Sequence, residues 1–352
     1  MINRAVSCQG ITCPFIRKDD DLVKIIVDSV LESGIKLHDN DVIGITESVI
    51  ARSQGNYVTV DEIANEITRL YGERSEIFVL FPIYSRNRFA MILKGIARSA
   101  DKINLVLDYE DEVGNVIHDH PFTGLNYDDL YRDICKSENC LCSILDSVEL
   151  EYELSRSKQA YKDSGKFLYC GLHDFDTFDY YKPFVNKYYT LADLFSDRCE
   201  YGLYGSNKAT EETLKLFPSK KGAQEVCNEV KKRLKKETKM DIIVCCYGDG
   251  CFKDPVGGIW EFADPITMPA YTNPELIEST PNEIKLKALI DNSASDAEVR
   301  RQIDSKEVNL KGSMKSQGTT PRLYRDLLAS LMDLVSGSGD RATPIVLVQN
   351  YF

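Results

Sequence analysis

The sequence has no long hydrophobic run and no excess of positive charge, and each absence argues against a class of protein. No apolar run approaches the roughly 18 residues of a membrane-spanning helix, and the start, MINRAVSCQG, lacks the apolar core of a signal peptide. The 352 residues carry 43 basic and 55 acidic side chains, a net charge of −12. We therefore expect a cytoplasmic protein that binds neither nucleic acid nor a membrane, although a few local donors could still hold an anionic ligand.

Several familiar catalytic and metal-binding patterns are also missing. The chain has no GxSxG nucleophile elbow, no HExxH helix and no GxxxxGK[ST] phosphate loop. Its eleven cysteines are odd in number and scattered, and Cys135, Cys140 and Cys142 form the only cluster. Their spacing is not the paired CxxC pattern of a zinc ribbon. We therefore expect reduced thiols rather than disulfides or structural zinc.

What remains is a pattern of short apolar runs that alternate with helical segments. Runs with the length of buried strands lie at 42–46, 77–81, 103–107, 241–247 and 343–349. Segments with helical periodicity or helix-terminal residues lie at 19–34, 88–97, 222–237, 282–290 and 321–335. The alternation predicts a mixed α/β fold rather than a helical bundle.

The composition and the periodicity of the sequence change in its middle third. The stretch HDFDTFDYYKPFVNKYY (173–189) is rich in aromatic residues and aspartate and has no clean periodicity. We therefore predict a core made of residues 1–115 and 240–352, with residues 116–239 as an inserted or second lobe.

The first candidate site is an acidic cluster that directly follows a predicted strand. After INLVL (103–107), the stretch DYEDEVGN (108–115) places four carboxylates within five positions. Such a stretch is either a solvated turn or a hard-cation site, because carboxylates can stay ionised side by side when Mg²⁺ or Mn²⁺ lies between them. The stretch alone leaves both interpretations open.

Three further loops are rich in glycine. YGDGCFKDPVGG (247–258) places Asp249 between two glycines at a strand end, where backbone can approach a ligand closely. SGSGDRATP (336–344) has the composition of a loop whose backbone amides bind phosphate, and GLYGSNKAT (202–210) combines glycines with a lysine. Each of these loops alone is equally compatible with a structural turn.

Taken in order, these segments resemble the coenzyme F420-0:L-glutamate ligase (gamma-glutamyl ligase) family. The resemblance covers about residues 11–115 and 240–350 and leaves the middle third unexplained. The segments that carry it are CPFIRKDDDLVKIIVDSV (13–30), NDVIGITESVIARSQG (40–55), DEVGN (111–115), GDGCFKDP (248–255) and SGSGDRATPIVLVQ (336–349).

The resemblance implies an enzyme of the gamma-glutamyl ligase fold that uses GTP to join L-glutamate to a carboxylate acceptor such as F420-0. The γ-phosphate of GTP would activate the acceptor as an acyl phosphate, which the amine of glutamate then attacks. Two Mg²⁺ or Mn²⁺ ions would neutralise the phosphates. The resemblance also implies a homodimer.

Carried over by position, the resemblance assigns the catalytic, metal-binding acids to Glu112 and Asp249 and further metal ligands to Asp111 and Ser338. It also assigns nucleotide contacts. These are Pro14 and Phe15; Glu47, Ser48 and Arg52 in a polar turn; Asn115; and Ser336, Gly337, Ser338, Gly339 and Asp340.

Three positions depart from the family pattern. The family commonly has lysine where this chain has Arg52, a hydroxyl residue where it has Gly250 and glutamine where it has Ser338. Neighbouring aspartate side chains would then replace the missing metal ligands. The departures leave rival interpretations open, which are a ligase for a folate-like acceptor, a non-catalytic nucleotide-binding protein and a metal-dependent phosphohydrolase.

Overall fold

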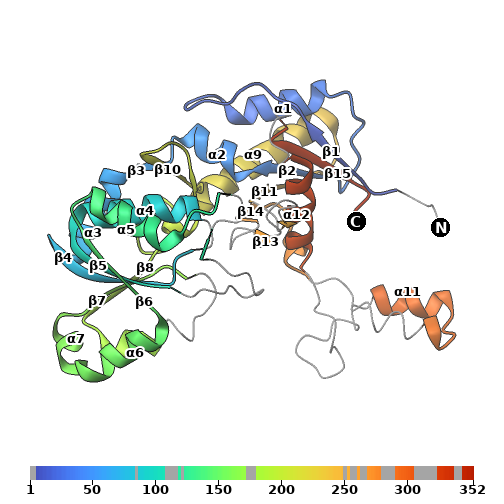
Figure 1. The fold of residues 1–352 in the computed structure, drawn as a ribbon. Helices are drawn as coiled ribbons and strands as arrows, with labels where there is room; N and C mark the ends of the chain where they lie inside the picture. The colour runs from blue at the N-terminus through green and yellow to red at the C-terminus, as the bar shows by residue number, and fades with distance from the viewer. Residues whose placement is uncertain are drawn as a thin grey trace.

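The computed structural model describes most of the chain. The described residues are 5–83, 86–107, 118–119, 123–171, 180–248, 252–253, 260–261, 268–278, 290–304, 323–336 and 343–352. Within them lie two five-stranded sheets, a three-stranded sheet and a two-stranded ladder. Figure 1 shows the two large sheets as the centres of separate layered units.

The first sheet joins the two ends of the chain. Its strand order is β1 (Ser7–Ile11), β15 (Ile345–Gln349), β2 (Val42–Thr46), β11 (Ile243–Tyr247) and β14 (Ala270–Tyr271). Strands β2 and β11 are parallel, whereas β15 is antiparallel to both of its neighbours. Helices α1 (Leu22–Glu32) and α9 (Lys220–Thr238) cover one face, and α12 (Tyr324–Ser336) covers the other (Figure 1).

Side chains that alternate along β2 pack on opposite faces of the first sheet. Ile43 and Ile45 are buried in the core beneath α1 and α9, whereas Val42 is buried in the core beneath α12. Gly44 shares the α12 face, where an added Cβ would lie 2.2 Å from the sulfur of Met332. Glycine at this position therefore lets α12 pack directly against the sheet.

The second large sheet is entirely parallel. Its order is β6 (Leu141–Leu145), β5 (Ala100–Val106), β4 (Ser75–Leu80), β7 (Lys166–Tyr169) and β8 (Lys187–Thr190). Parallel sheets need cover on both faces. Here α3 (Val60–Tyr71), α4 (Arg86–Ser99) and α5 (Tyr127–Ser137) cover one face, and α6 (Ser147–Arg156) and α7 (Lys158–Ser164) cover the other.

A small antiparallel sheet links the two units. Its order is β3 (Tyr57–Thr59), β10 (Thr213–Leu216) and β9 (Ser206–Lys208). Strand β10 contacts α2 (Glu47–Gln54), which follows the first sheet, and β9 contacts α4 of the second unit. The remaining described elements are η1 (Lys182–Phe184), η2 (Gly202–Tyr204), β12 (Phe252–Lys253), β13 (Trp260–Glu261), η3 (Pro274–Ile277) and α11 (Asp296–Asp304).

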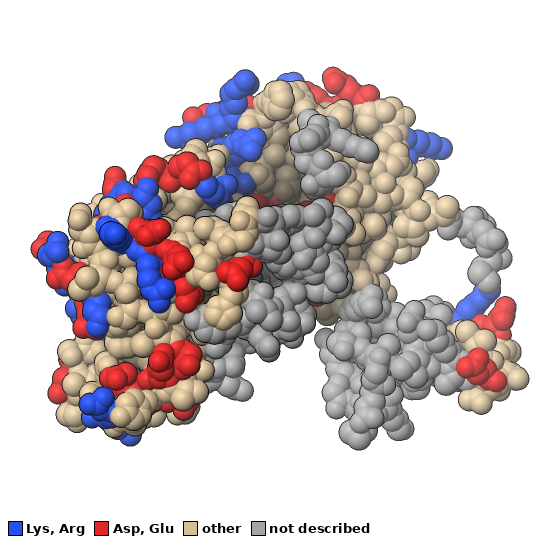
Figure 2. Space-filling model, in the orientation of Figure 1, with Lys and Arg blue, Asp and Glu red and all other residues tan. Residues whose placement is uncertain are grey.

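The surface agrees with the acidic composition. On the face drawn in Figure 2, basic side chains of the described residues are interspersed with acidic ones rather than gathered in one patch. Among the described residues, no helix combines the length and the apolar character that crossing a membrane requires.

The predicted mixed α/β fold is confirmed. The predicted strands correspond to β2, β4, β5, β11 and β15, and four of the predicted helices to α1, α4, α9 and α12. The helix predicted at 282–290 lies outside the described residues except for its last one.

The prediction of a polar turn after β2 was wrong, because this segment is helix α2. Thr46 caps it, with its hydroxyl accepting a hydrogen bond from the Ser48 amide at 3.4 Å, and Gly55 ends it in the left-handed conformation. A hydroxyl residue before a helix and a glycine after it are ordinary boundary residues.

The strand pairing also bears on the predicted division into lobes. Strands β4 and β5, which the division at residue 115 assigns to the core, pair with β6 and β7 instead. The boundary at 115 thus falls inside the second unit. We propose that the second lobe runs from β3 to β10 and that the core consists of the segments on either side.

Candidate active site

Several predicted site segments meet at one end of the first sheet. Because β2 and β11 are parallel, Glu47 and Gly248 leave the sheet at the same end. Because β15 is antiparallel to β1 and β2, Thr12 leaves β1 where Pro344 enters β15. The amide of Thr46 donates to the carbonyl of Pro344 at 3.0 Å. Segments that are up to 332 residues apart in the chain, Thr12 and Pro344, therefore lie at one end of the sheet.

All four predicted metal ligands lie outside the described residues; these are Asp111, Glu112, Asp249 and Ser338. The predicted nucleotide contacts Asn115, Gly337, Gly339 and Asp340 also lie outside them. Ser336, the last residue of α12, does lie near the sheet, and its hydroxyl accepts a hydrogen bond from the Tyr247 hydroxyl at 2.8 Å. Within the described residues, no group of three histidine, cysteine or acidic side chains is arranged to hold a metal ion.

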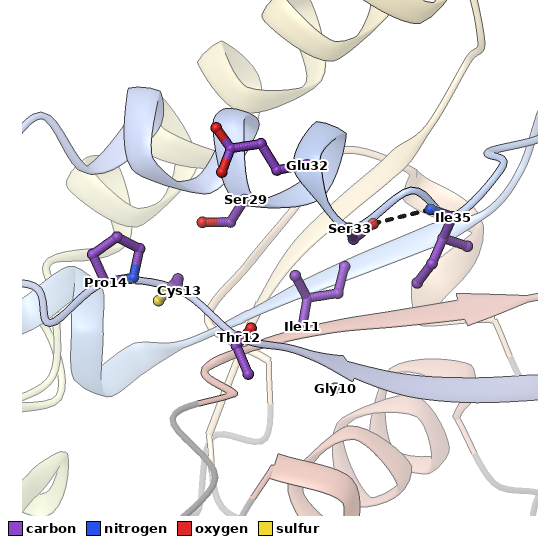
Figure 3. A pocket seen from close by; sticks show the side chains of 9 residues that line it. All are labelled: Gly10, Ile11, Thr12, Cys13, Pro14, Ser29, Glu32, Ser33 and Ile35. Carbon is purple, nitrogen blue, oxygen red and sulfur yellow. Dashed lines mark hydrogen bonds between the residues drawn. The ribbon is translucent and has the colours of Figure 1, made fainter.

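Pro14 and Phe15 lie in the segment after β1, and both are exposed; the exposed fraction of Phe15 is 78%. A pocket of about 510 Å³ opens beside this segment. Figure 3 shows it between residues 10–14 on one side and the last turns of α1, with Ser29 and Glu32, on the other. The predicted nucleotide segment thus borders a pocket with both apolar and polar walls.

A buried polar cluster forms where α2 meets the small sheet. Glu47 is only 2% exposed, and its Oε1 accepts a hydrogen bond from Asn207 Nδ2 at 3.1 Å. The ammonium of Lys215, a residue 8% exposed, lies 3.7 Å from the same oxygen and donates to the Ser48 hydroxyl. The structure therefore brings together two predicted residues, Glu47 and Ser48, and two that were not predicted.

Electrostatics explains why the glutamate accompanies the lysine. The N-terminus of a helix carries partial positive charge, so the ammonium of Lys215 beside the start of α2 is unfavourable by itself. Burial adds a desolvation cost for any unpaired charge. The carboxylate of Glu47 opposes both costs. The result is an ammonium, a hydroxyl and helix-terminal amides gathered within the first turn of α2, an arrangement suited to phosphate oxygens.

The second unit reaches this cluster through β9. Arg88, at the start of α4 just after β4, donates to the carbonyl oxygens of Ser206 and Tyr204. The Tyr204 hydroxyl donates to the carbonyl of Gly171, just beyond β7, at 2.8 Å. Asn207, which lies next to Ser206 in β9, then donates a hydrogen bond to Glu47. Hydrogen bonds therefore connect the carboxyl ends of β4 and β7 with the start of α2.

Comparison with known proteins gives the family. The family model described as F420-0:Gamma-glutamyl ligase matches residues 10–350. The chain belongs to this family. The match includes the middle third of the chain, which the resemblance of individual segments had left unexplained. No curated protein matches the chain.

Membership of the F420-0:gamma-glutamyl ligase family implies a GTP-dependent ligase that forms a carbon–nitrogen bond between glutamate and F420-0. Family membership also suggests divalent metal ions. Arg52, predicted to contact the nucleotide of this ligase, is exposed on α2 one helical turn after Ser48. Since residues four apart share a helix face, Arg52 and Ser48 point to the same side of α2.

Sequence reasoning missed Lys215 and Asn207 for different reasons. Lys215 lies between two buried leucines in the short strand TLKL, an alternation that predicts an outward-facing lysine and therefore hides its burial. The loop 202–210 was noted for its glycines and Lys208. Lys208, however, is exposed and pairs with Glu211 at 2.7 Å, while its neighbour Asn207 faces the cluster.

The buried pair generates a stability prediction. Lys215→Met removes the ammonium from beside a buried carboxylate, so the free energy of unfolding should fall by about 2–4 kcal/mol in urea titrations. Adding Glu47→Gln should recover part of this loss, because the carboxylate that needed the ammonium is gone. Lys208→Met, an exposed control seven residues away, should change the value by less than about 0.5 kcal/mol. Equal losses for the two lysines would show that the pair is not coupled to folding.

Proposed function

We propose that this ligase joins L-glutamate to the carboxylate of F420-0 through an acyl phosphate made from GTP. The observation that carries the proposal is the buried cluster of Lys215, Ser48 and Glu47 at the start of α2. A protein with a net charge of −12 must bind a nucleotide through local donors. The cluster concentrates such donors at the sheet end from which the predicted nucleotide segments leave.

The phosphates of GTP bind at the first turn of α2. The Ser48 hydroxyl and the Lys215 ammonium donate to them from inside, and the guanidinium of Arg52 donates from the exposed side. Pro14 and Phe15, together with Ser336, Gly337, Ser338, Gly339 and Asp340, complete the nucleotide site from the neighbouring strand ends, and Asn115 adds a contact from the acidic loop. The working unit is a homodimer.

Divalent metal ions bind through Asp111, Glu112, Asp249 and Ser338. These side chains supply hard oxygen donors, which suit Mg²⁺ and Mn²⁺. Asp249 directly follows Gly248, which leaves the first sheet beside Glu47. When bound, the ions neutralise charge on the phosphates.

In the reaction, a carboxylate oxygen of the acceptor attacks the γ-phosphorus and GDP leaves. The amine of glutamate then attacks the acyl carbon, phosphate leaves and the nitrogen loses a proton. Lys215 and Arg52 stabilise negative charge on the transferred phosphoryl oxygens. Burial of Lys215 and Glu47 between the lobes keeps water away from this side of the site, which protects the acyl phosphate from hydrolysis.

The test is a reaction mixture of the purified chain with GTP, Mn²⁺, L-glutamate and F420-0, from which each component is omitted in turn. We expect GDP release that depends on both glutamate and F420-0, with a product that gains one or more glutamyl residues by mass spectrometry. GDP release without glutamate would indicate a phosphohydrolase. Tight GTP binding without turnover would indicate a non-catalytic nucleotide-binding protein, and turnover with a folate in place of F420-0 would reassign the acceptor.

The proposed role of Arg52 leads to a prediction for nucleotide binding. Arg52→Ala should weaken GTP binding by about 1.5–3 kcal/mol in calorimetry, because a charge-assisted hydrogen bond to phosphate is lost. Arg52→Lys, which introduces the residue common in the family, should retain most of the affinity. Arg69→Ala, an exposed arginine on α3, is the matched control. Unchanged affinity in Arg52→Ala would remove Arg52 from the site.

The metal assignment predicts a change in thermal stability. Mn²⁺ with GTP should raise the melting temperature of the native protein, because a ligand that binds only the folded state stabilises it by mass action. Glu112→Gln and Asp249→Asn should each abolish this rise and the ligase activity with it. Glu151→Gln, an exposed acid on α6, should keep both. A normal rise in both site variants would mean that these acids are solvated turn residues.

A further inference from the structure

Helix α5 ends in a turn that brings the side chains of Cys135 and Cys140 close together. The amide of Cys140 donates to the carbonyl of Cys135 at 2.9 Å, and the amide of Asn139, whose φ is 59°, donates to the carbonyl of Lys136 at 3.1 Å. This is the Schellman arrangement, in which the residues at the positions of Cys135 and Cys140 pack their side chains against each other. The usual apolar contact of this motif is here made by two thiols.

The strand that follows adds a third thiol on the same side. Cys142 lies two residues after Cys140, so it points to the same face of the extended chain, while Leu141 between them is 70% exposed on the opposite face. Cys142 packs against the core that contains Cys135 and Cys140 and is only partly buried. It is therefore the member of the trio that solvent can reach.

The three thiols influence one another's ionisation. Interaction with the thiols of Cys140 and Cys142 raises the pKa of Cys135, and interaction with Cys135 lowers the pKa of the other two. Among the neighbouring charges, Arg132 also lowers the pKa of Cys142, whereas Asp128 raises it. A thiol reacts as its thiolate, so Cys142, which is only partly buried, is the reactive member.

The other thiols among the described residues have a different environment. All ten cysteines among the described residues are free. Burial raises the pKa of Cys8 to about 11 and also raises that of the half-buried Cys13. Lowered thiol pKa values, contact with further thiols and partial exposure coincide at Cys142.

We propose that Cys135, Cys140 and Cys142 form a peroxide-reactive site that holds one reversible disulfide, between Cys135 and Cys142. The Cys142 thiolate attacks a peroxide oxygen, so that an S–O bond forms, the O–O bond breaks and the leaving hydroxide is protonated to water. The sulfur of Cys135 then attacks the sulfenic sulfur while the Cys140 thiolate accepts the proton of Cys135 and passes it to the departing hydroxide. The S–S bond forms, the S–O bond breaks and a second water leaves. A dithiol reductant restores the site.

The test uses the full chain, treated with equimolar hydrogen peroxide, alkylated and mapped by peptide mass spectrometry. We expect a Cys135–Cys142 cross-link that dithiothreitol removes. Cys142→Ser should abolish the cross-link, and Cys135→Ser should stop at a sulfenic acid on Cys142 that dimedone traps. Cys140→Ser should slow disulfide formation by about a hundredfold, the typical contribution of a general base. Cys13→Ser, a half-buried thiol outside the trio, should leave the cross-link unchanged.

Two results would overturn the proposal. One is oxidation of Cys13 or Cys8 at least as fast as oxidation of Cys142, which would make the trio an ordinary part of the core. The other is a cross-link that does not join Cys135 to Cys142. Melting curves of each variant, with Cys142→Ala as a second replacement, separate loss of reactivity from loss of folding. Because the readout is covalent, the outcome is independent of whether the chain ligates glutamate.

Discussion

The architecture depends on the insertion of β15 between β1 and β2. The last strand of the chain pairs antiparallel with the two strands nearest the start, so both chain ends are fixed in one sheet. This pairing brings the entry to β15 to the end of the sheet where β1, β2 and β11 finish. The loops that carry the predicted nucleotide residues therefore share one edge. Without this register, they would be unrelated segments of a long chain.

A buried charge pair couples this edge to the second lobe. Glu47 and Lys215 are taken from water by the packing of α2 on β10, and each is tolerable there because the other is present. Asn207 extends the contact along β9, and Arg88 connects β9 to the end of β4. The positions of two strand-end regions, one from each sheet, are thus linked by side chains with definite geometry rather than by apolar contact alone.

Local patterns in the sequence predicted several of the strands and helices, although not helix α2. The apolar run 42–46 and the helical segment 222–237 reappear as β2 and α9 with small shifts at their ends. The order of the strands in the sheets could not be predicted from the sequence, because apolar runs of similar composition do not specify which strands they pair with. This is why the predicted division at residue 115 assigned β4 and β5 to the core, whereas in the structure they pair with β6 and β7.

The site was only partly predictable for a related reason. Glu47 and Ser48 were predicted as site residues because they stand in one short segment that resembles the family, but their conformation was predicted as a turn rather than as helix α2. Lys215 is separated from Ser48 by 167 residues and meets it only through the pairing of β10 with β3. A contact of this kind follows from topology, which no local pattern contains.

The position of Lys215 also bears on why this chain has arginine at position 52. An ammonium is a compact point charge, whereas a guanidinium is a planar group that donates in a fixed fork, so the two are not equivalent toward phosphate. In this structure an ammonium already lies against Ser48 at the start of α2, supplied by β10. In the proposed nucleotide site, a second ammonium one turn further along the helix would repeat the donor that Lys215 supplies. A guanidinium at the exposed position adds donors of different geometry on the solvent side, which is the arrangement the sequence has.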